Sequence, residues 1–378
     1  LIDNDIFYNN EIFNSAVDFA TPLGEFSIES GLLYTFKQIN NEQFTLTNSE
    51  KVTSHYTYDE NTYAGYIVVK RKVNQWGIQI GLRSEQFESE GKVSGMDQSI
   101  NLNFFNLFPS IHIQYKKNDL LNYTLGYNRR IARPSFYHIN PITTINDPLF
   151  RRVGNPALQP EFTDNLEVGL NFNAKKINVN TSLYYRHMTN LINQTFEIDD
   201  NKVTIMSFNN GGESHTVGTE INVLKDINEH FSASWSGNAY YQHASPMLDD
   251  FFYEDQYNYN FRTKLNYKTG KKFSLDVQWM YFGPSRRLNV DVEDRNFINL
   301  AVRYKILKGA GTINLRFTDI FRGNIFENER ISHELLEENK WLGQTRLAIL
   351  SFTYNFNKGN IKRRKGSQKS YNESGALE

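Results

Sequence analysis

The feature that most constrains this chain is the alternation of apolar and polar residues along its extended segments. In residues 76–82 (WGIQIGL), tryptophan, isoleucine and leucine take every second position, and glycine and glutamine take the others. Residues 122–127 (NYTLGY) and 231–241 (FSASWSGNAYY) follow the same rule. A period of two places alternate side chains on opposite faces of an extended strand. The chain is therefore expected to consist of amphipathic strands.

The alternation predicts about fifteen strands. Their expected ranges are 10–20, 24–38, 60–73, 75–88, 100–117, 120–131, 163–174, 176–192, 203–224, 229–242, 252–268, 271–284, 296–308, 311–322 and 344–357. Most exceed about ten residues, whereas strands of soluble proteins average about five or six. A tilted strand that crosses a bilayer needs about nine to eleven residues. The one weak helical window, residues 329–341, lies between two of these strands.

The links between the strands alternate strictly between short and long. Short turns are expected near 21–24, 74–75, 117–119, 174–176, 226–229, 268–271 and 308–311. Longer links are expected at 39–59, 89–99, 132–162, 193–202, 243–251, 285–295 and 323–343. Outer-membrane barrels have short periplasmic turns and long outer loops. The pattern thus favours an all-β fold, a transmembrane antiparallel up-and-down β-barrel with about 15 strands in this chain. A soluble sandwich, propeller or solenoid is the alternative, but it explains only the alternation.

Composition narrows the class of protein further. Phe and Tyr number 28 and 22, which suits long pleated strands. The net charge of −1 argues against a nucleic-acid partner. The chain has no cysteine, which excludes disulfides and thiol chemistry. Residues 1–20 show no signal-peptide pattern.

Strand parity predicts the boundaries of the barrel portion. The last strand, near 347–356, should run toward the periplasm, so the first of fifteen begins on the outer side. Because single-chain barrels normally have an even number of strands, one or more strands are expected before Leu1. Residues 1–357 are assigned to the carboxy-terminal part of a barrel. Residues 358–378, which are basic and polar, are assigned to a disordered periplasmic tail.

One proline-rich stretch carries a family resemblance. Residues 127–141 (YNRRIARPSFYHINP) and 154–172 (GNPALQPEFTDNLEVGLNF) resemble the Bacteroidetes-type outer-membrane β-barrel family, which is similar to the carboxy-terminal barrel of TonB-dependent receptors. The resemblance covers most of the chain. It implies a cell outer membrane location, surrounding membrane lipid, and a barrel of 22 strands completed by parts that this chain lacks.

The resemblance also implies a function and partners. The expected function is nutrient uptake by an outer-membrane receptor, TonB-dependent and non-catalytic. The TonB complex would act through a plug domain outside this chain, and the barrel-assembly machinery would recognise the last strand. The nutrient ligand is unknown. The alternative is a structural barrel at the cell surface, such as a scaffold, an adhesin or a secretion component.

The candidate ligand-binding residues lie in outer links. They are Arg129, Arg130, Arg133, Phe136, Arg151, Arg152, Phe251 and Phe252. Guanidinium groups can bind carboxylate or phosphate bidentately. The alternative, which we favour, is that these arginines pin the loop to the barrel wall, with Glu161 or Asp164 as partners.

The same stretch contains a structural motif. Its residues are Pro134, Asn140, Pro141, Gly154, Asn155, Pro156, Pro160 and Glu161. Prolines cannot donate to a strand ladder, which excludes 132–162 from a central strand. Gly154-Asn155-Pro156 predicts a turn. The loop is therefore expected to be preorganised, either as a gate or as a scaffold.

No catalytic, cofactor or metal site is expected. The eight histidines are scattered and form no His-x-x-x-His pair. Ser214 and His215 are adjacent on an expected strand and point to opposite faces, which suits a Ser–His dyad poorly. Acidic loops such as 249–256 could bind calcium, although solvated loops explain them better.

Overall fold

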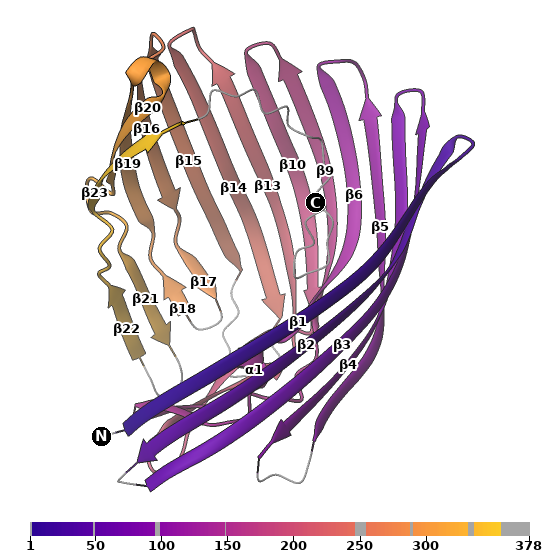
Figure 1. Cartoon of the computed structure of the whole chain (residues 1–378), viewed down its shortest axis with the longest axis vertical. Helices are drawn as coiled ribbons and strands as arrows, with labels where there is room; N and C mark the ends of the chain where they lie inside the picture. The colour runs from indigo at the N-terminus through magenta and orange to yellow at the C-terminus, as the bar shows by residue number, and fades with distance from the viewer. Residues whose placement is uncertain are drawn as a thin grey trace.

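Fifteen strands form one antiparallel sheet, here called the wall. The computed structural model describes residues 2–47, 50–94, 99–147, 149–245, 255–287, 290–331 and 336–356. The wall strands, in order, are β1 (Ile2–Leu23), β2 (Phe26–Thr47), β3 (Glu50–Val73), β4 (Trp76–Val93), β5 (Ile100–Lys116), β6 (Leu121–Ala132), β9 (Glu161–Ala174), β10 (Ile177–Thr189), β13 (Glu213–Asp226), β14 (Phe231–Ser245), β15 (Gln256–Thr269), β16 (Phe273–Phe282), β19 (Arg295–Ile306), β20 (Gly311–Thr318) and β23 (Leu347–Tyr354). Figure 1 shows the wall curved about an interior, as part of a barrel would be. The prediction of fifteen antiparallel strands is confirmed.

The links alternate between the two edges of the wall, as expected. Short turns, such as 24–25, 74–75 and 175–176, join strands at the upper edge in Figure 1. The long links 133–160 and 190–212 lie at the opposite edge, here called the long-link edge. No helix in the described part of the chain is long and apolar enough to cross a membrane.

One face of the wall is apolar, as the alternation predicts. On β4 the residues Trp76, Ile78, Ile80 and Leu82 pair with Tyr115, Ile113, Ile111 and Pro109 of β5. The residues between them on β4 are Gly77, Gln79 and Gly81, and Arg83 continues this second face. The register thus keeps the apolar positions of neighbouring strands together, since a slip of one residue would reverse every face.

Aromatic rings border the apolar face at both ends. Near the short turns, the rings of Trp76 and Tyr115 lie 4.6 Å apart, and Tyr123 continues the row. Toward the long-link edge, Tyr34 and Tyr63 stack with their centroids 5.1 Å apart. Two aromatic girdles around an apolar band are typical of a barrel in a bilayer.

The wall extends far beyond the apolar band on one side. β2 has 22 residues, or about 70 Å at about 3.3 Å per residue, against an apolar band about 25 Å tall. The prediction of a link at 39–59 is wrong, because Ile39 pairs with Tyr58 and the ladder continues to Thr47 and Glu50. These polar segments stay paired because their inward side chains pack against other parts of the chain.

The long links fold into two small sheets that the sequence did not reveal. One sheet contains β11 (Ile192–Ile198), β12 (Thr204–Asn210), β8 (Phe150–Arg152) and β7 (Thr144–Asp147) in that order. The other contains β17 (Ser285–Arg287), β18 (Val290–Val292), β21 (Phe326–Ile331) and β22 (Leu336–Trp341).

Two further predictions are wrong. The expected strand 203–224 is two strands, because Gly211 and Gly212 (φ +157° and +74°) interrupt it in a conformation that favours glycine. The weak helical window 329–341 contains parts of β21 and β22, which pair as a hairpin. The assigned tail 358–378 lies outside the described residues.

Candidate functional site

Two consecutive long links join into one body at the long-link edge, here called the cap. It consists of α1 (Phe136–Ile139), β7, β8, β11 and β12, with the segments between them. Strand β12 pairs with β11 as a hairpin and with β8 in parallel, which connects link 190–212 to link 133–160. The stretch 132–162 was expected to contribute no central strand, and its described part between 133 and 160 contributes none to the wall. Its ends differ from the expectation, because Ala132 belongs to β6 and Glu161 and Phe162 belong to β9.

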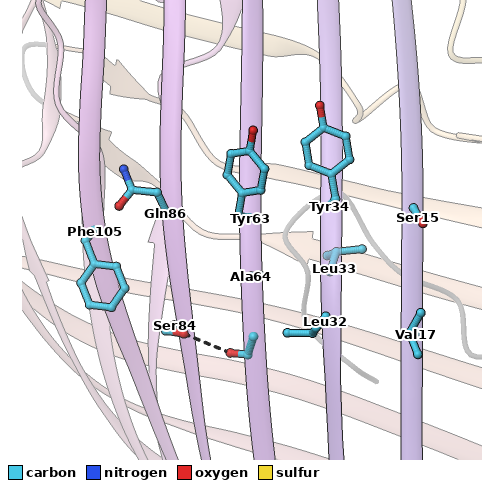
Figure 2. A pocket seen from close by; sticks show the side chains of 11 residues that line it. Ser15, Val17, Leu32, Leu33, Tyr34, Tyr63, Ala64, Ser84, Gln86 and Phe105 are labelled. Carbon is cyan, nitrogen blue, oxygen red and sulfur yellow. Dashed lines mark hydrogen bonds between the residues drawn. The ribbon is translucent and has the colours of Figure 1, made fainter.

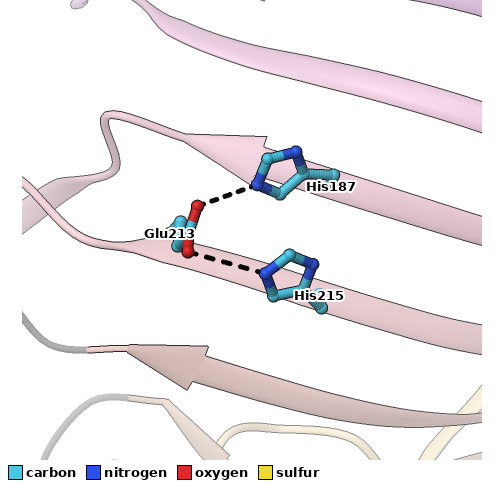
Figure 3. Close-up of side chains that lie close together, drawn as sticks. All are labelled: His187, Glu213 and His215. Atoms are coloured by element: carbon cyan, nitrogen blue, oxygen red, sulfur yellow. Dashed lines mark hydrogen bonds and ion pairs between the residues drawn. The ribbon is translucent and has the colours of Figure 1, made fainter.

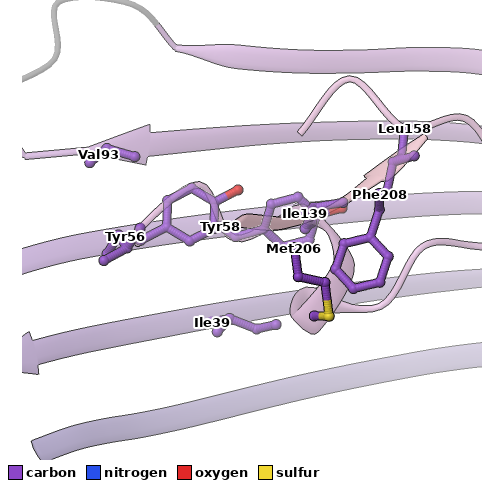
Figure 4. Packing of buried hydrophobic residues seen from close by; sticks show 9 residues of the cluster. Ile39, Tyr56, Tyr58, Val93, Ile139, Leu158, Met206 and Phe208 are labelled. Atoms are coloured by element: carbon purple, nitrogen blue, oxygen red, sulfur yellow. The ribbon is translucent and has the colours of Figure 1, made fainter. Parts of the chain in front are cut away.

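The cap packs on the wall through an apolar core. Its buried members are Ile39, Tyr56, Tyr58 and Val93 of the wall and Ile139, Ile142, Leu158, Met206 and Phe208 of the cap (Figure 4). Leu32 of β2 is 70% exposed and belongs to the apolar face of the wall. Ile39 lies seven residues further along the same strand, so its side chain points to the opposite face. The cap therefore lies on the face of the wall opposite the apolar band, inside its curvature.

The Gly-Asn-Pro turn fastens the cap internally. A Cβ at Gly154 would lie 2.4 Å from the carbonyl oxygen of Asn140, so only glycine fits. The Asn155 backbone N–H donates to the His138 carbonyl over 2.7 Å, and its side-chain amide donates to the Phe208 carbonyl over 2.9 Å. The predicted turn is present, and it holds α1 against β12.

Pro160 and Glu161 close the cap where the chain re-enters the wall. The Ile192 backbone N–H donates to the Glu161 carboxylate over 2.7 Å, and the Asn190 amide donates to the Pro160 carbonyl over 2.8 Å. Burial raises the pKa of the Glu161 carboxyl group, and the hydrogen bond from Ile192 partly opposes this shift. Asn155, Pro160 and Glu161 of the motif therefore join the two links.

Arg133 and its partners form an ion network on the inner face of the wall. Its guanidinium pairs with Glu85, which also accepts from Arg83 over 2.6 Å. The Arg133 guanidinium lies 5.0 Å from the ring centroid of Phe87. Glu85 is only 5% exposed, and the two arginines supply the opposite charges that a buried carboxylate needs as partners. Arg133 is thus pinned to β4, by a partner other than those expected.

Arg129 and Arg130 lie on adjacent, opposite-facing positions of β6. Arg129 pairs over 3.7 Å with Asp164, one of the two expected partners, and lies 5.0 Å from the ring centroid of Phe162. Because Arg129 and Asp164 both belong to wall strands, this pair does not pin the loop. Arg130 donates to the side-chain oxygen of Asn128 over 3.1 Å. Because successive strand residues face opposite sides, these two guanidinium groups do not share one site.

The remaining candidates divide between the cap and the part of the chain that is not described. Arg151 and Arg152 belong to β8, where Arg152 lies 4.1 Å from the ring centroid of Tyr137. Phe136 stacks on Tyr56 of the wall with 5.6 Å between centroids, which makes it a packing residue. Phe251 and Phe252 lie outside the described residues.

A shallow hollow of about 490 Å³ on the apolar face is not a candidate for the ligand site. Figure 2 shows Val17, Leu32, Tyr63 and Phe105 around it. Gly65, which pairs with Leu32, leaves the gap. The hollow opens on the side opposite the cap, where an apolar band meets lipid.

Comparison with known proteins identifies the family. The model of the outer membrane protein beta-barrel family matches residues 1–354. The chain belongs to this family. The resemblance to an outer-membrane β-barrel family is thereby confirmed, the soluble alternative is wrong, and the protein is located in the cell outer membrane. No curated protein sequence matches the chain.

Solved structures with the same fold include several receptors. The copper transporter OprC superposes with a TM-score of 0.73 at 12% identity, over 92% of this chain and 57% of that chain. The ferric yersiniabactin uptake receptor FyuA from Yersinia pestis gives 0.68 at 11% identity, over 94% and 55%. The siderophore receptor PiuA from Acinetobacter baumannii gives 0.66 at 13% identity, over 92% and 56%. The chain thus spans little more than half the length of these proteins.

Proposed function

We propose that this barrel is part of an outer-membrane receptor that takes up a nutrient, with energy from the TonB complex. One observation supports it most. Two long links fold into a defined cap that rests on the inner face of the wall, at the edge that would face outward. Such a body is suited to receive a ligand entering the lumen. In this proposal the full-length protein completes the barrel with further strands and supplies a plug domain that contacts TonB.

The inner face near the cap is polar and charged. Arg133, Glu85 and Arg83 lie there, and the side-chain amide of Gln43 reaches the Thr143 carbonyl of the cap over 3.0 Å. A ligand that enters the lumen beside the cap would meet guanidinium groups, which suit an anionic or polyoxygenated compound. We propose binding without catalysis, which agrees with the opposite faces of Ser214 and His215.

The test is uptake by cells that lack the full-length gene. The structural neighbours include a copper transporter and a ferric yersiniabactin receptor, so radiolabelled chelates of copper and iron are the first panel. We expect the deletion strain to lose uptake of one compound. Inactivation of TonB should cause an equal loss. Unchanged uptake across a broad nutrient panel would contradict the proposal and favour a structural barrel at the cell surface.

A pair of matched variants tests the role of the cap. Phe208→Ala removes a ring from the apolar core between cap and wall. Leu183→Ala removes a side chain of similar size from the apolar face, where it is 64% exposed. Uptake should fall only in the first variant, with equal amounts of both proteins in the membrane. Equal uptake by both variants would exclude the cap from transport.

A further inference from the structure

Four titratable side chains occupy directly paired positions on neighbouring wall strands. His187 of β10 pairs with Asp164 of β9 on one side and with His215 of β13 on the other, and His215 pairs with His243 of β14. The four residues are separated in sequence, and the register of the sheet alone aligns them. Directly paired residues of an antiparallel sheet have Cβ atoms about 4.5–5.5 Å apart.

Three ligand-type side chains converge in the middle of this row. Figure 3 shows Glu213 between the imidazoles of His187 and His215. One carboxylate oxygen lies 2.9 Å from Nε2 of His187, and the other lies 3.7 Å from Nε2 of His215. The two rings are nearly parallel with centroids 4.5 Å apart. All three potential ligand atoms lie within 4.8 Å of one another.

The group lies on the outward face, beyond the apolar band. Leu183, Tyr185 and His187 share one face of β10, and Leu183 and the neighbouring Val217 are 64% and 53% exposed. Tyr185 follows Leu183 toward the long-link edge, and His187 comes one step further. An ion could therefore reach the three side chains from the surrounding water, without passing through the lumen.

A neighbouring hydroxyl group orients one of the rings. The Tyr185 hydroxyl lies 2.8 Å from Nδ1 of His215. When Nδ1–H donates to this oxygen, Nε2 keeps its lone pair and faces Glu213. A metal-binding histidine usually donates a hydrogen bond from its second ring nitrogen, which fixes the tautomer and the ring orientation.

We propose that His187, His215 and Glu213 form a site for a divalent ion of the later first-row transition metals, such as Zn²⁺. Two imidazoles and one carboxylate are a known zinc ligand set, which leaves a fourth position for water. Two ligand atoms of a tetrahedral ion lie about 3.4 Å apart when the bonds are about 2.0–2.2 Å. Zn²⁺ binding therefore requires small side-chain rotations that move Glu213 away from His187 and bring it closer to His215. A search for paired histidines within one segment misses this site, because His187 and His215 lie on different strands.

The experiment is a Zn²⁺ titration of the full-length protein, purified in detergent micelles and stripped with a chelator. Isothermal titration calorimetry should detect a site that His187→Gln and His215→Gln each weaken at least tenfold. Excess Mg²⁺ should not compete, since it prefers oxygen ligands. With Cu²⁺ as the probe, electron paramagnetic resonance should show two nitrogen ligands in the unchanged protein and one in either variant.

The matched control is His243→Gln. His243 belongs to the same row, but it pairs with Asp255 over 2.7 Å instead of Glu213. This variant should bind Zn²⁺ like the unchanged protein and should show two nitrogen ligands with Cu²⁺. The proposal would be overturned if all three substitutions weakened Zn²⁺ binding equally, or if no Zn²⁺ binding depended on His187 and His215. The group would then be only a set of His–Glu contacts.

Discussion

Gly154 shows how a single residue determines the shape of the cap. Its φ is ordinary, so the constraint is the approach of the Asn140 backbone and not the backbone conformation. Gly154→Ala places a Cβ 2.4 Å from the Asn140 carbonyl oxygen. Overpacking of this kind costs about 1–3 kcal/mol. We expect faster hydrogen exchange at the backbone amides of α1 and β12, while the wall strands remain protected.

The control for this substitution is Gly343→Ala. A Cβ there would meet nothing closer than the Thr345 Cγ2 at 3.9 Å, which is an ordinary contact. This variant should exchange like the unchanged protein. If Gly154→Ala also left exchange in the cap unchanged, the close approach at Asn140 would not constrain the turn.

His138 should make the stability of the cap depend on pH. Burial lowers the pKa of His138, and its Nδ1 accepts from the Ser135 backbone N–H over 3.2 Å. Both effects favour the neutral ring in the folded cap. In the unfolded cap, His138 should have the ordinary histidine pKa of about 6.5. The contribution of the neutral ring to the stability of the cap is therefore fully present above that pH, and it is lost as the pH falls through the lower pKa of the folded cap.

The measurement is hydrogen exchange of the cap amides between pH 7.5 and 5, corrected for the intrinsic exchange rate. Local opening should become more frequent toward pH 5. His138→Gln, which has no titrating ring, should show a flatter profile over the same range. A profile that the substitution leaves unchanged would assign the dependence to other groups.

Sequence alone could not assign the roles of individual arginines. Arg133 contacts Glu85, which lies on a different strand and carries no local signal in the sequence. Asp164 could be named as a partner of Arg129 because it closely follows the proline-rich stretch. Contacts that depend on strand register become visible only once the register is known.

At the scale of elements, the cap and the extended wall strands stabilise each other. Phe208 is 1% exposed and meets the rings of Tyr137 and His138, with centroids 5.4 and 4.8 Å away. Phe208→Ala should destabilise the docked cap by about 3–5 kcal/mol, the usual range for truncating a buried phenylalanine. The measurement is limited proteolysis of the links 133–160 and 190–212 in detergent micelles.

The control is Phe321→Ala in another long link. Phe321 is 74% exposed, so its truncation removes little packing. Cleavage of the cap should accelerate only in the Phe208 variant. Equal cleavage rates in both variants would show that the apolar core does not hold the cap on the wall.

The elements outside the apolar band were the hardest to predict. The sequence predicts a polar link at 39–59, but these residues continue the pairing of β2 with β3. Their inward side chains Ile39, Tyr56 and Tyr58 pack on the cap. Outside a bilayer, the outward face of such a strand needs no apolar residue, so the alternation weakens. The small strands of the cap depend on pairing between two separate links, which no single window of sequence contains.

At the scale of the whole molecule, the bilayer explains why the fifteen strands could be predicted. Lipid on one side requires an apolar residue at every second position, and the absence of water there requires all backbone groups to pair. These two requirements produce the regular alternation seen in residues 76–82 and similar segments. The links obey no comparable rule, and so the family, but not the ligand, follows from the sequence.

The same reasoning gives a prediction about which face of the wall meets lipid. Leu183 lies within the apolar band and is 64% exposed, whereas Asn180 is exposed on the opposite face of the same strand. Leu183→Arg should cost about 2–4 kcal/mol at mid-bilayer depth, because the charge meets hydrocarbon. Asn180→Arg should be tolerated, because its side chain meets the polar interior.

The measurement is urea titration of the full-length protein in lipid vesicles, with the folded fraction read from heat-modifiable migration on a gel. Equal midpoints for the two variants would mean that the faces have been assigned wrongly, and a lower midpoint for Asn180→Arg would mean that they are reversed.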